Sequence, residues 1–225
     1  MFRRIILPTA IVWICALGFS RAAESMLSEI GFTGKRTISQ KIYEESVEPA
    51  SLTNRIGKFF LVADQACRRG AAKIGKSPNQ IGSLSGACLE YSVLIELHHK
   101  KLTPAYYQAE LIDSPNNVFD VLLWTKEHGP IVLSCKTSLR ERYKQADLEG
   151  LALIKLYARA RSYLITLDSD KQHVATCRAK IADKEITGLA GIYDETNSDE
   201  LFAWLARQTM IAAPEGRLKK ARRIP

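Results

Sequence analysis

The clearest hydrophobic pattern in the chain is a pair of short apolar runs at residues 118–124 and 131–135, separated by a turn that contains Gly129. Apolar runs of this length, bounded by turn residues, predict two strands of a buried β-hairpin. Asp120 interrupts the first run and Lys136 follows the second. A charge among apolar residues is costly unless it is paired or binds a metal, so these two residues are the strongest functional signal in the chain.

The remaining pattern alternates between helical and strand spacing. Helices are predicted over residues 84–97, 139–160, 171–185 and 198–210. Strands in addition to the hairpin are predicted over residues 106–112, 161–167 and 188–193. The order α-β-β-β-α-β-α-β-α predicts an α/β fold, an α/β/α sandwich with a central mixed sheet.

Three segments are predicted along the 225 residues, which suffice for one full hydrophobic core. Residues 1–75 are mostly helical in pattern, residues 76–212 contain the alternating elements, and residues 213–225 form a basic tail that we expect to be mobile. Residues 75–77 read Gly-Lys-Ser. They are not interpreted as a phosphate-binding loop, because no strand is predicted before them.

The net charge of +8 favours an anionic partner, and nucleic acid is the commonest one. A basic surface without such a role is the alternative. The five cysteines are scattered and the four histidines show no ligand spacing, so neither a disulfide framework nor a zinc site is predicted. This cysteine usage is typical of a reducing compartment.

The N-terminal sequence, in contrast, is typical of an exported protein. Arg3 and Arg4 precede an apolar run from Ile5 to Phe19, a pattern that is typical of a secretory signal. The run is short for a membrane span, so a membrane location is not expected. A buried first element, or a start codon assigned too far upstream, explains the run as well. We expect a cytoplasmic protein, and export is the alternative if residues 1–22 are a signal peptide.

Two carboxylates on the helices before and after the hairpin are further candidates for the same functional site. Glu90 lies on the preceding helix, 30 residues before Asp120, and Glu149 lies 13 residues after Lys136. Helical phase places Glu149 on the apolar side of its helix, where a carboxylate is expected to be paired or to bind a metal. Gly150 would allow a close backbone approach there.

Other acidic residues are expected to have supporting or structural roles. Glu96, on the same predicted helix as Glu90, is an alternative to it. Asp168 and Asp170 precede a predicted helix and are interpreted as helix caps rather than ligands. For each candidate acid, a solvated or capped structural side chain is the alternative interpretation.

The order of Glu90, Asp120 and the Ser134-Cys135-Lys136 segment resembles the core of the PD-(D/E)XK nuclease superfamily. The usual motif has an acid where this chain has Ser134. In the branch of restriction enzymes similar to the EcoRII catalytic domain, a glutamate on the next helix replaces that acid, and Glu149 stands at the matching position. The resemblance covers residues 84–168, about a third of the chain.

The resemblance implies Mg²⁺-dependent hydrolysis of DNA phosphodiesters without a small-molecule cofactor. Asp120 and Glu149 would hold Mg²⁺. Lys136 would orient or activate the attacking water and stabilise charge on the phosphorane. Glu90 would be a supporting acid or a ligand of a second metal.

A basic-acidic-basic triplet follows the lysine in the same branch, and here it reads Arg140, Glu141 and Arg142. In that branch the triplet reads adjacent C:G pairs. The chemistry fits, because arginine can bond guanine O6 and N7 together and a carboxylate can accept from cytosine N4. A solvated helix start is the alternative interpretation of these three residues.

Together these features predict a type II restriction endonuclease-like enzyme that cuts double-stranded DNA at a site containing CC/GG. We expect a homodimer, because a palindromic site mirrors two-fold protein symmetry. One alternative is a repair or junction nuclease of the same superfamily. The other is a non-catalytic DNA-binding or exported protein on a decayed nuclease scaffold.

Overall fold

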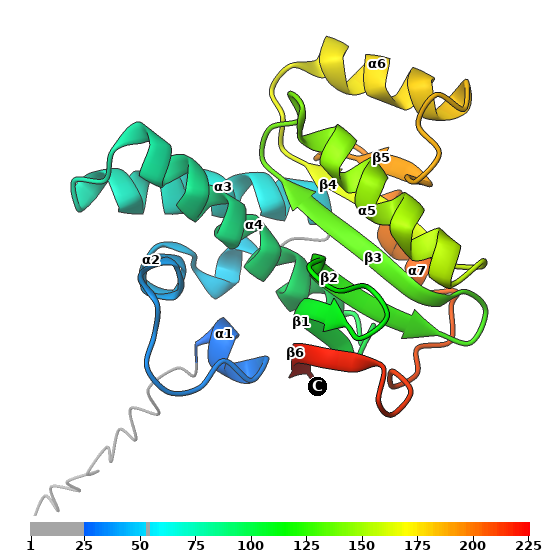
Figure 1. Cartoon of the computed structure of the whole chain (residues 1–225). Helices are drawn as coiled ribbons and strands as arrows, with labels where there is room; N and C mark the ends of the chain where they lie inside the picture. The colour runs from blue at the N-terminus through cyan, green and yellow to red at the C-terminus, as the bar shows by residue number, and fades with distance from the viewer. Residues whose placement is uncertain (1–24, 53–54) are drawn as a thin grey trace, which may run out of the picture.

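The computed structural model describes residues 25–52 and 55–225 (Figure 1). The signal-like run in residues 1–22 lies outside the described residues. In the described ranges, none of the helices has the length and apolar character that crossing a membrane requires.

Six strands form one mixed sheet in the order β5-β4-β3-β2-β1-β6. They are β1 (Ala105–Leu111), β2 (Val118–Thr125), β3 (Gly129–Lys136), β4 (Arg161–Thr166), β5 (Gly191–Tyr193) and β6 (Leu218–Ile224). β1, β2 and β3 form an antiparallel meander, and β6 pairs antiparallel with β1. β3, β4 and β5 are parallel to one another. The predicted hairpin is therefore confirmed as β2 and β3.

Helices cover both faces of this sheet (Figure 1). One face packs against α1 (Met26–Glu29), α2 (Ile38–Ser46), α3 (Ile56–Lys73), α4 (Pro78–His99) and α7 (Ser198–Leu205). The other face packs against α5 (Arg142–Leu156) and α6 (Lys171–Ala182), and a short 3-10 helix spans Pro49–Ser51. The predicted α/β class and mixed sheet are confirmed.

Alternation along β2 shows why both faces are covered. Val121 and Leu123 enter the core under α4, whereas Leu122 and Trp124 enter the core on the opposite face. All four side chains are buried, as expected for a central strand with helices on each side. The described part of the helical segment predicted in residues 1–75 contains helices joined by loops, and its Phe60 shares a core with the sheet.

Two helix starts differ from the sequence prediction for local reasons, and α5, α6 and α7 each end a few residues earlier than predicted. α4 begins at Pro78 instead of residue 84, because Ser77 and Gln80 form a capping box that starts the helix before its apolar stripe begins. α5 begins only at Arg142, because Arg140 has a positive φ of 32° that no helix accommodates.

The basic tail expected at residues 213–225 is the main error of the sequence prediction. Residues 218–224 form β6, which pairs with β1 so that Ile224 lies opposite Ala105. Ile224 is fully buried. An unpaired β1 would expose a row of backbone donors and acceptors, and β6 satisfies them.

A close backbone contact, expected at Gly150, is present between α5 and the segment before β5. A Cβ atom added to Gly150 would lie 2.1 Å from the carbonyl oxygen of Gly188. A Cβ added to Gly188 would lie 2.0 Å from the carbonyl oxygen of Asp147. Because both obstacles are backbone atoms, a side chain at either glycine would force α5 and the segment before β5 apart.

Alanine at Gly150 is therefore expected to lower the free energy of unfolding by about 2–3 kcal/mol, as overpacked sites do. Gly82 in α4 is the matched control, because nothing lies within 4 Å of its added Cβ. Gly82→Ala is expected to raise stability by about 0.5–1 kcal/mol. Urea unfolding of both variants tests the contact, and equal effects at the two positions would contradict it.

Candidate active site

Asp120 and Lys136 form an ion pair between β2 and β3. The ammonium nitrogen of Lys136 lies 2.8 Å from Oδ2 of Asp120, and the backbone N–H of Cys135 donates to the same oxygen at 2.8 Å. The side chain of Lys136 is only 14% exposed and that of Asp120 only 13%. Each of the two charges that interrupt the apolar hairpin thus compensates the other.

The ion pair determines the protonation of the lysine. Burial by itself lowers the pKa of Lys136, but the charge of Asp120 and its hydrogen bond outweigh burial and raise this pKa above its usual value. Lys136 is therefore an ammonium ion at neutral pH. It can donate hydrogen bonds and stabilise negative charge, but it cannot remove a proton from water.

Glu90 reaches the site from α4. Its Oε2 accepts a hydrogen bond of 2.8 Å from the side-chain amide of Gln108. Burial and then the charge of Asp120 raise the pKa of Glu90 to about 7, against opposing effects that include Gln108 and Lys136. Glu90 is thus partly protonated near neutral pH, which suits a group that exchanges protons.

Glu149 reaches the site from α5, on the opposite face of the sheet. Its Oε1 accepts a hydrogen bond of 2.8 Å from Gln145. Burial raises the pKa of Glu149, Gln145 and Lys136 lower it, and the charge of Asp120 raises it. The carboxylate therefore lies within electrostatic reach of the ion pair.

Both further acids of the sequence prediction, Glu90 and Glu149, thus lie within electrostatic reach of the ion pair of Asp120 and Lys136. The alternative acid Glu96 does not join them. It is buried in α4, and the charges that act on it are those of Lys100, His99 and Asp199.

Gln108 is a residue of this site that the sequence analysis missed. It has a positive φ of 47°, and the pairing of β1 with β6 shifts register between Tyr107 and Glu110. A left-handed glutamine inside a strand is uncommon, and such irregularities concentrate next to active sites. The only signal in the sequence is a polar residue inside a predicted strand, and side-chain polarity does not reveal φ.

The carboxylates of the site have the chemistry that Mg²⁺ prefers. Asp120, Glu149 and Glu90 supply hard oxygen donors. Among the described residues, no three acidic, histidine or cysteine side chains are gathered closely enough to hold a metal by themselves. Mg²⁺ is commonly held by one or two carboxylates with water in its other positions, and these carboxylates have the oxygen donors for that arrangement.

The triplet Arg140, Glu141 and Arg142 lies at the start of α5, as predicted, and all three residues are exposed. Glu141 pairs with Lys144 at 2.5 Å on the surface. The guanidinium of Arg140 has no hydrogen-bond or ion-pair partner in the described ranges. Arg140 is therefore available to an external ligand.

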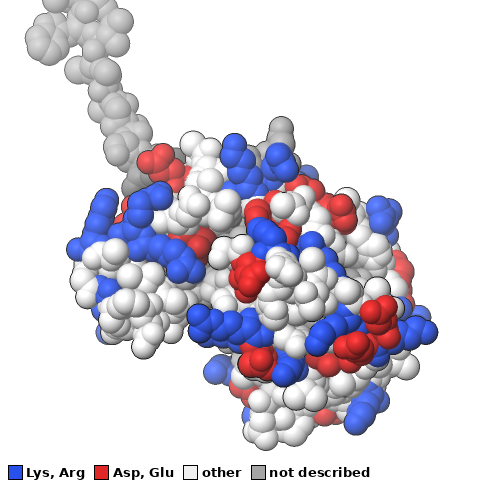
Figure 2. Space-filling model, turned by 90° about the horizontal axis from the view of Figure 1, so that it is seen from above, with Lys and Arg blue, Asp and Glu red and all other residues white. Residues whose placement is uncertain are grey.

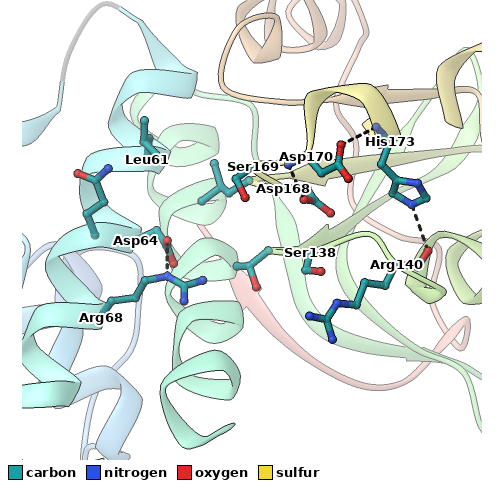
Figure 3. Close-up of a pocket in the computed structure, with 12 residues that line it drawn as sticks. Leu61, Asp64, Arg68, Ser138, Arg140, Asp168, Ser169, Asp170 and His173 are labelled. Carbon is teal, nitrogen blue, oxygen red and sulfur yellow. Dashed lines mark hydrogen bonds and ion pairs between the residues drawn. The ribbon is translucent and has the colours of Figure 1, made fainter. Parts of the chain in front are cut away.

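A cleft of about 750 Å³ is lined in part by Thr137 and Ser138, which directly follow Lys136 in the chain. Figure 3 shows this cleft. It separates α3 from the loops that follow β3 and β4, and the side chains of Arg68 and Arg140 enter it from opposite walls. None of the four catalytic candidates lines it. Figure 2 shows basic and acidic groups interspersed over the face of the molecule seen from above.

The acidic residues of this cleft have structural partners. Oδ2 of Asp168 accepts from the backbone N–H of Leu139 at 2.6 Å and holds the loop after β3. Asp170 caps α6 by accepting from the N–H of His173 at 2.9 Å, so its predicted role is confirmed. Asp64 accepts hydrogen bonds from Ser85 and Arg68.

Residues 70–77 do not form a phosphate-binding loop. Their sequence has the GxxxxGKS spacing, but α3 runs through Lys73 and Ser77 caps α4. Within the described chain, helices and not strands precede this segment. The strand–loop–helix geometry that the motif requires is therefore missing.

Comparison with protein-family models, curated proteins and solved structures finds no match to this chain. The functional argument therefore rests on the geometry and chemistry of the residues above.

Glu90 is expected to make the stability of the metal-free protein depend on pH. Its pKa rises from a usual 4.5 to about 7 on folding, so the folded chain holds a proton that the unfolded chain releases. This contribution is complete below about pH 4.5 and is lost as pH rises through about 7, by up to about 3 kcal/mol. Urea unfolding in EDTA between pH 5 and pH 8 measures it.

Glu90→Gln should remove this fall, because glutamine does not titrate. The exposed carboxylate Glu185 provides the control, and Glu185→Gln should keep the wild-type profile. The assignment of a raised pKa to Glu90 is wrong if Glu90→Gln also keeps that profile.

The left-handed backbone of Gln108 predicts that glycine at this position gives a more stable protein than alanine, the reverse of the usual order. Gln108→Gly and Gln108→Ala both remove the amide that bonds Glu90, but only glycine adopts a positive φ without cost. The glycine variant should therefore be more stable than the alanine variant by about 1 kcal/mol. At Ala109, where φ is not positive, Ala109→Gly should destabilise the protein. Thermal unfolding compares these variants, and a more stable Gln108→Ala would exclude the strained conformation.

Proposed function

We propose that the protein is a Mg²⁺-dependent deoxyribonuclease that resembles type II restriction enzymes of the PD-(D/E)XK superfamily. The observation that carries this proposal is the partly buried ion pair of Asp120 and Lys136 with two further carboxylates in its electrostatic reach. An ion pair with a purely structural role needs only its two opposite charges. Additional acids with perturbed pKa values around such a pair are typical of catalytic sites.

The topology supports the proposal as well. A helix, α4, precedes the antiparallel meander β1–β3, and α5 then connects β3 to the parallel strand β4. Asp120 lies on the second strand of this unit and Lys136 at the end of the third. This is the order of elements that the superfamily resemblance implies, with Glu149 on the connecting helix.

In the proposed reaction, each residue acts in the protonation state that its surroundings favour. Lys136, held as an ammonium ion by Asp120, stabilises the negative charge that develops on the phosphate. Glu90, with a pKa of about 7, can accept a proton at neutral pH. Asp120 and Glu149 would hold the Mg²⁺, which when bound polarises the phosphate and acidifies a coordinated water.

The proposed substrate is double-stranded DNA with a site containing CC/GG, read by Arg140, Glu141 and Arg142. The exposure of these residues at the start of α5, a few positions after Lys136, supports such a role. We propose a homodimer, which matches a palindromic site by its two-fold symmetry. A cytoplasmic location would place such an enzyme beside its DNA substrate.

Plasmid digestion with Mg²⁺, against an EDTA control, tests the proposed function. Lys136→Ala and Glu149→Gln should each lower the cleavage rate by at least about 100-fold, because each removes charge from the reacting centre. The controls are Lys155→Ala on the exposed side of α5 and Glu185→Gln, which should cut like wild type. Thermal unfolding identifies any variant that lost its fold.

The pattern of products separates the alternatives. Discrete fragments that require metal and Lys136 support a site-specific nuclease, and mapping their ends gives the site. A metal-dependent smear favours a repair or junction nuclease. Plasmids of several sequences, all unmethylated, should be included, and intact DNA in every case contradicts nuclease activity.

A further inference from the structure

β6 brings a run of cations to the edge of the sheet at the level of the candidate site. Its segment contains no acid and five basic residues, which are Arg217, Lys219, Lys220, Arg222 and Arg223. Arg222 lies opposite Tyr107 of β1, and Lys220 lies opposite Glu110. The two cations therefore flank the position of Gln108. Figure 1 shows β6 at one edge of the sheet, with the C-terminus beside it.

Polar residues continue across the sheet at this level. Pairing of Tyr107 with Val121 and of Ala109 with Phe119 places Gln108 opposite Asp120. Asp120 in turn contacts Lys136 of β3. With neighbouring strands about 4.8 Å apart, β6 lies roughly 14 Å from β3. At about 3.4 Å per nucleotide, this distance corresponds to about four nucleotides of a DNA strand.

A hollow with two cations in its lining lies between β1 and β6. The hollow measures about 430 Å³ and is lined by Tyr107, Gln108, Lys220, Ala221 and Arg222. Its two charged lining residues, Lys220 and Arg222, are both cations. Gln108 borders the hollow and also donates a hydrogen bond to Glu90, which places the hollow directly outside the candidate site.

The cations of residues 217–223 have different partners within the fold. Arg217 pairs with Asp113 at 2.5 Å, and Lys219 pairs with Glu110 at 3.0 Å. Arg222 lies over the ring of Phe32, 4.5 Å from its centroid. The ammonium of Lys220 has no partner in the described part of the chain. Lys220 is therefore free to bind an external anion, and the ring orients Arg222 beside it.

We propose that β6 binds the phosphodiester backbone of the DNA strand that leads into the candidate site, with Lys220 and Arg222 on phosphates next to Glu90. This inference rests on the proposed function and adds a binding surface to it. Phosphate contacts hold the duplex in register without reading its sequence, so this surface complements the triplet at α5. The competing explanation is that charged residues on an edge strand prevent pairing between molecules.

Equilibrium binding of the full-length protein to a fluorescent DNA duplex in EDTA tests the proposal without catalysis. Lys220→Gln should weaken binding by about 3- to 10-fold for duplexes with and without CC/GG alike. It should also reduce the slope of log affinity against log salt by about 1, and Lys220→Arg should restore both. Lys73→Gln, which removes an exposed lysine at the end of α3, is the matched control and should change neither.

Failure of this proposal can be distinguished from failure of the proposed function. If wild type binds and cuts DNA but Lys220→Gln and Lys73→Gln have equal affinities and salt slopes, the β6 surface is refuted and the nuclease proposal stands. Increased self-association of Lys220→Gln in sedimentation, with unchanged DNA affinity, would assign the cations to edge protection and also overturn it. A wild-type protein that binds no duplex contradicts both proposals.

Discussion

The site depends on the partly buried ion pair between Asp120 and Lys136, which joins two neighbouring strands in the middle of the sheet. Removing either partner would leave a largely desolvated charge uncompensated, which destabilises the fold. The same pair decides the chemistry around it. Asp120 keeps Lys136 protonated, and its charge adds to the effect of burial in raising the pKa of Glu90, so one carboxylate acts on both a cation and a second acid. In the proposed nuclease, charge stabilisation and proton transfer therefore belong to different residues.

The mixed sheet brings contributions from both of its faces to this pair. The antiparallel meander places Asp120 and Gln108 side by side, while the parallel half requires the crossover helix that carries Glu149. Glu90 comes from α4 on the other face. The close contact of Gly150 with Gly188 fixes how deeply the crossover helix packs, and so fixes the height at which Glu149 meets the sheet. The bulge at Gln108 lets β1 direct its amide to Glu90 within an otherwise regular pairing.

Much of the fold could be predicted because it depends on local patterns. The hairpin at Asp120 and Lys136 follows from two apolar runs and a turn, and the cap at Asp170 follows from its place before a helix. The helix starts next to Ser77 and Arg140 were not predicted, because the spacing of hydrophobic residues does not reveal capping hydrogen bonds or backbone φ. β6 was missed for a different reason. A short, strongly basic segment resembles a solvated tail until an unpaired edge of β1 supplies its partner.

The sequence by itself determined which charges interrupt apolar strands, the order of helices and strands, and the acids on the flanking helices. Those properties depend on the types and spacing of residues that are close together in the sequence. Only the tertiary structure decided that Glu90 and Glu149 converge on one ion pair from opposite faces while Glu96 does not. It also decided that Gln108 adopts a left-handed conformation and that Lys220 flanks the site. These outcomes depend on strand register and on contacts between residues far apart in the chain, because burial and charge act through space.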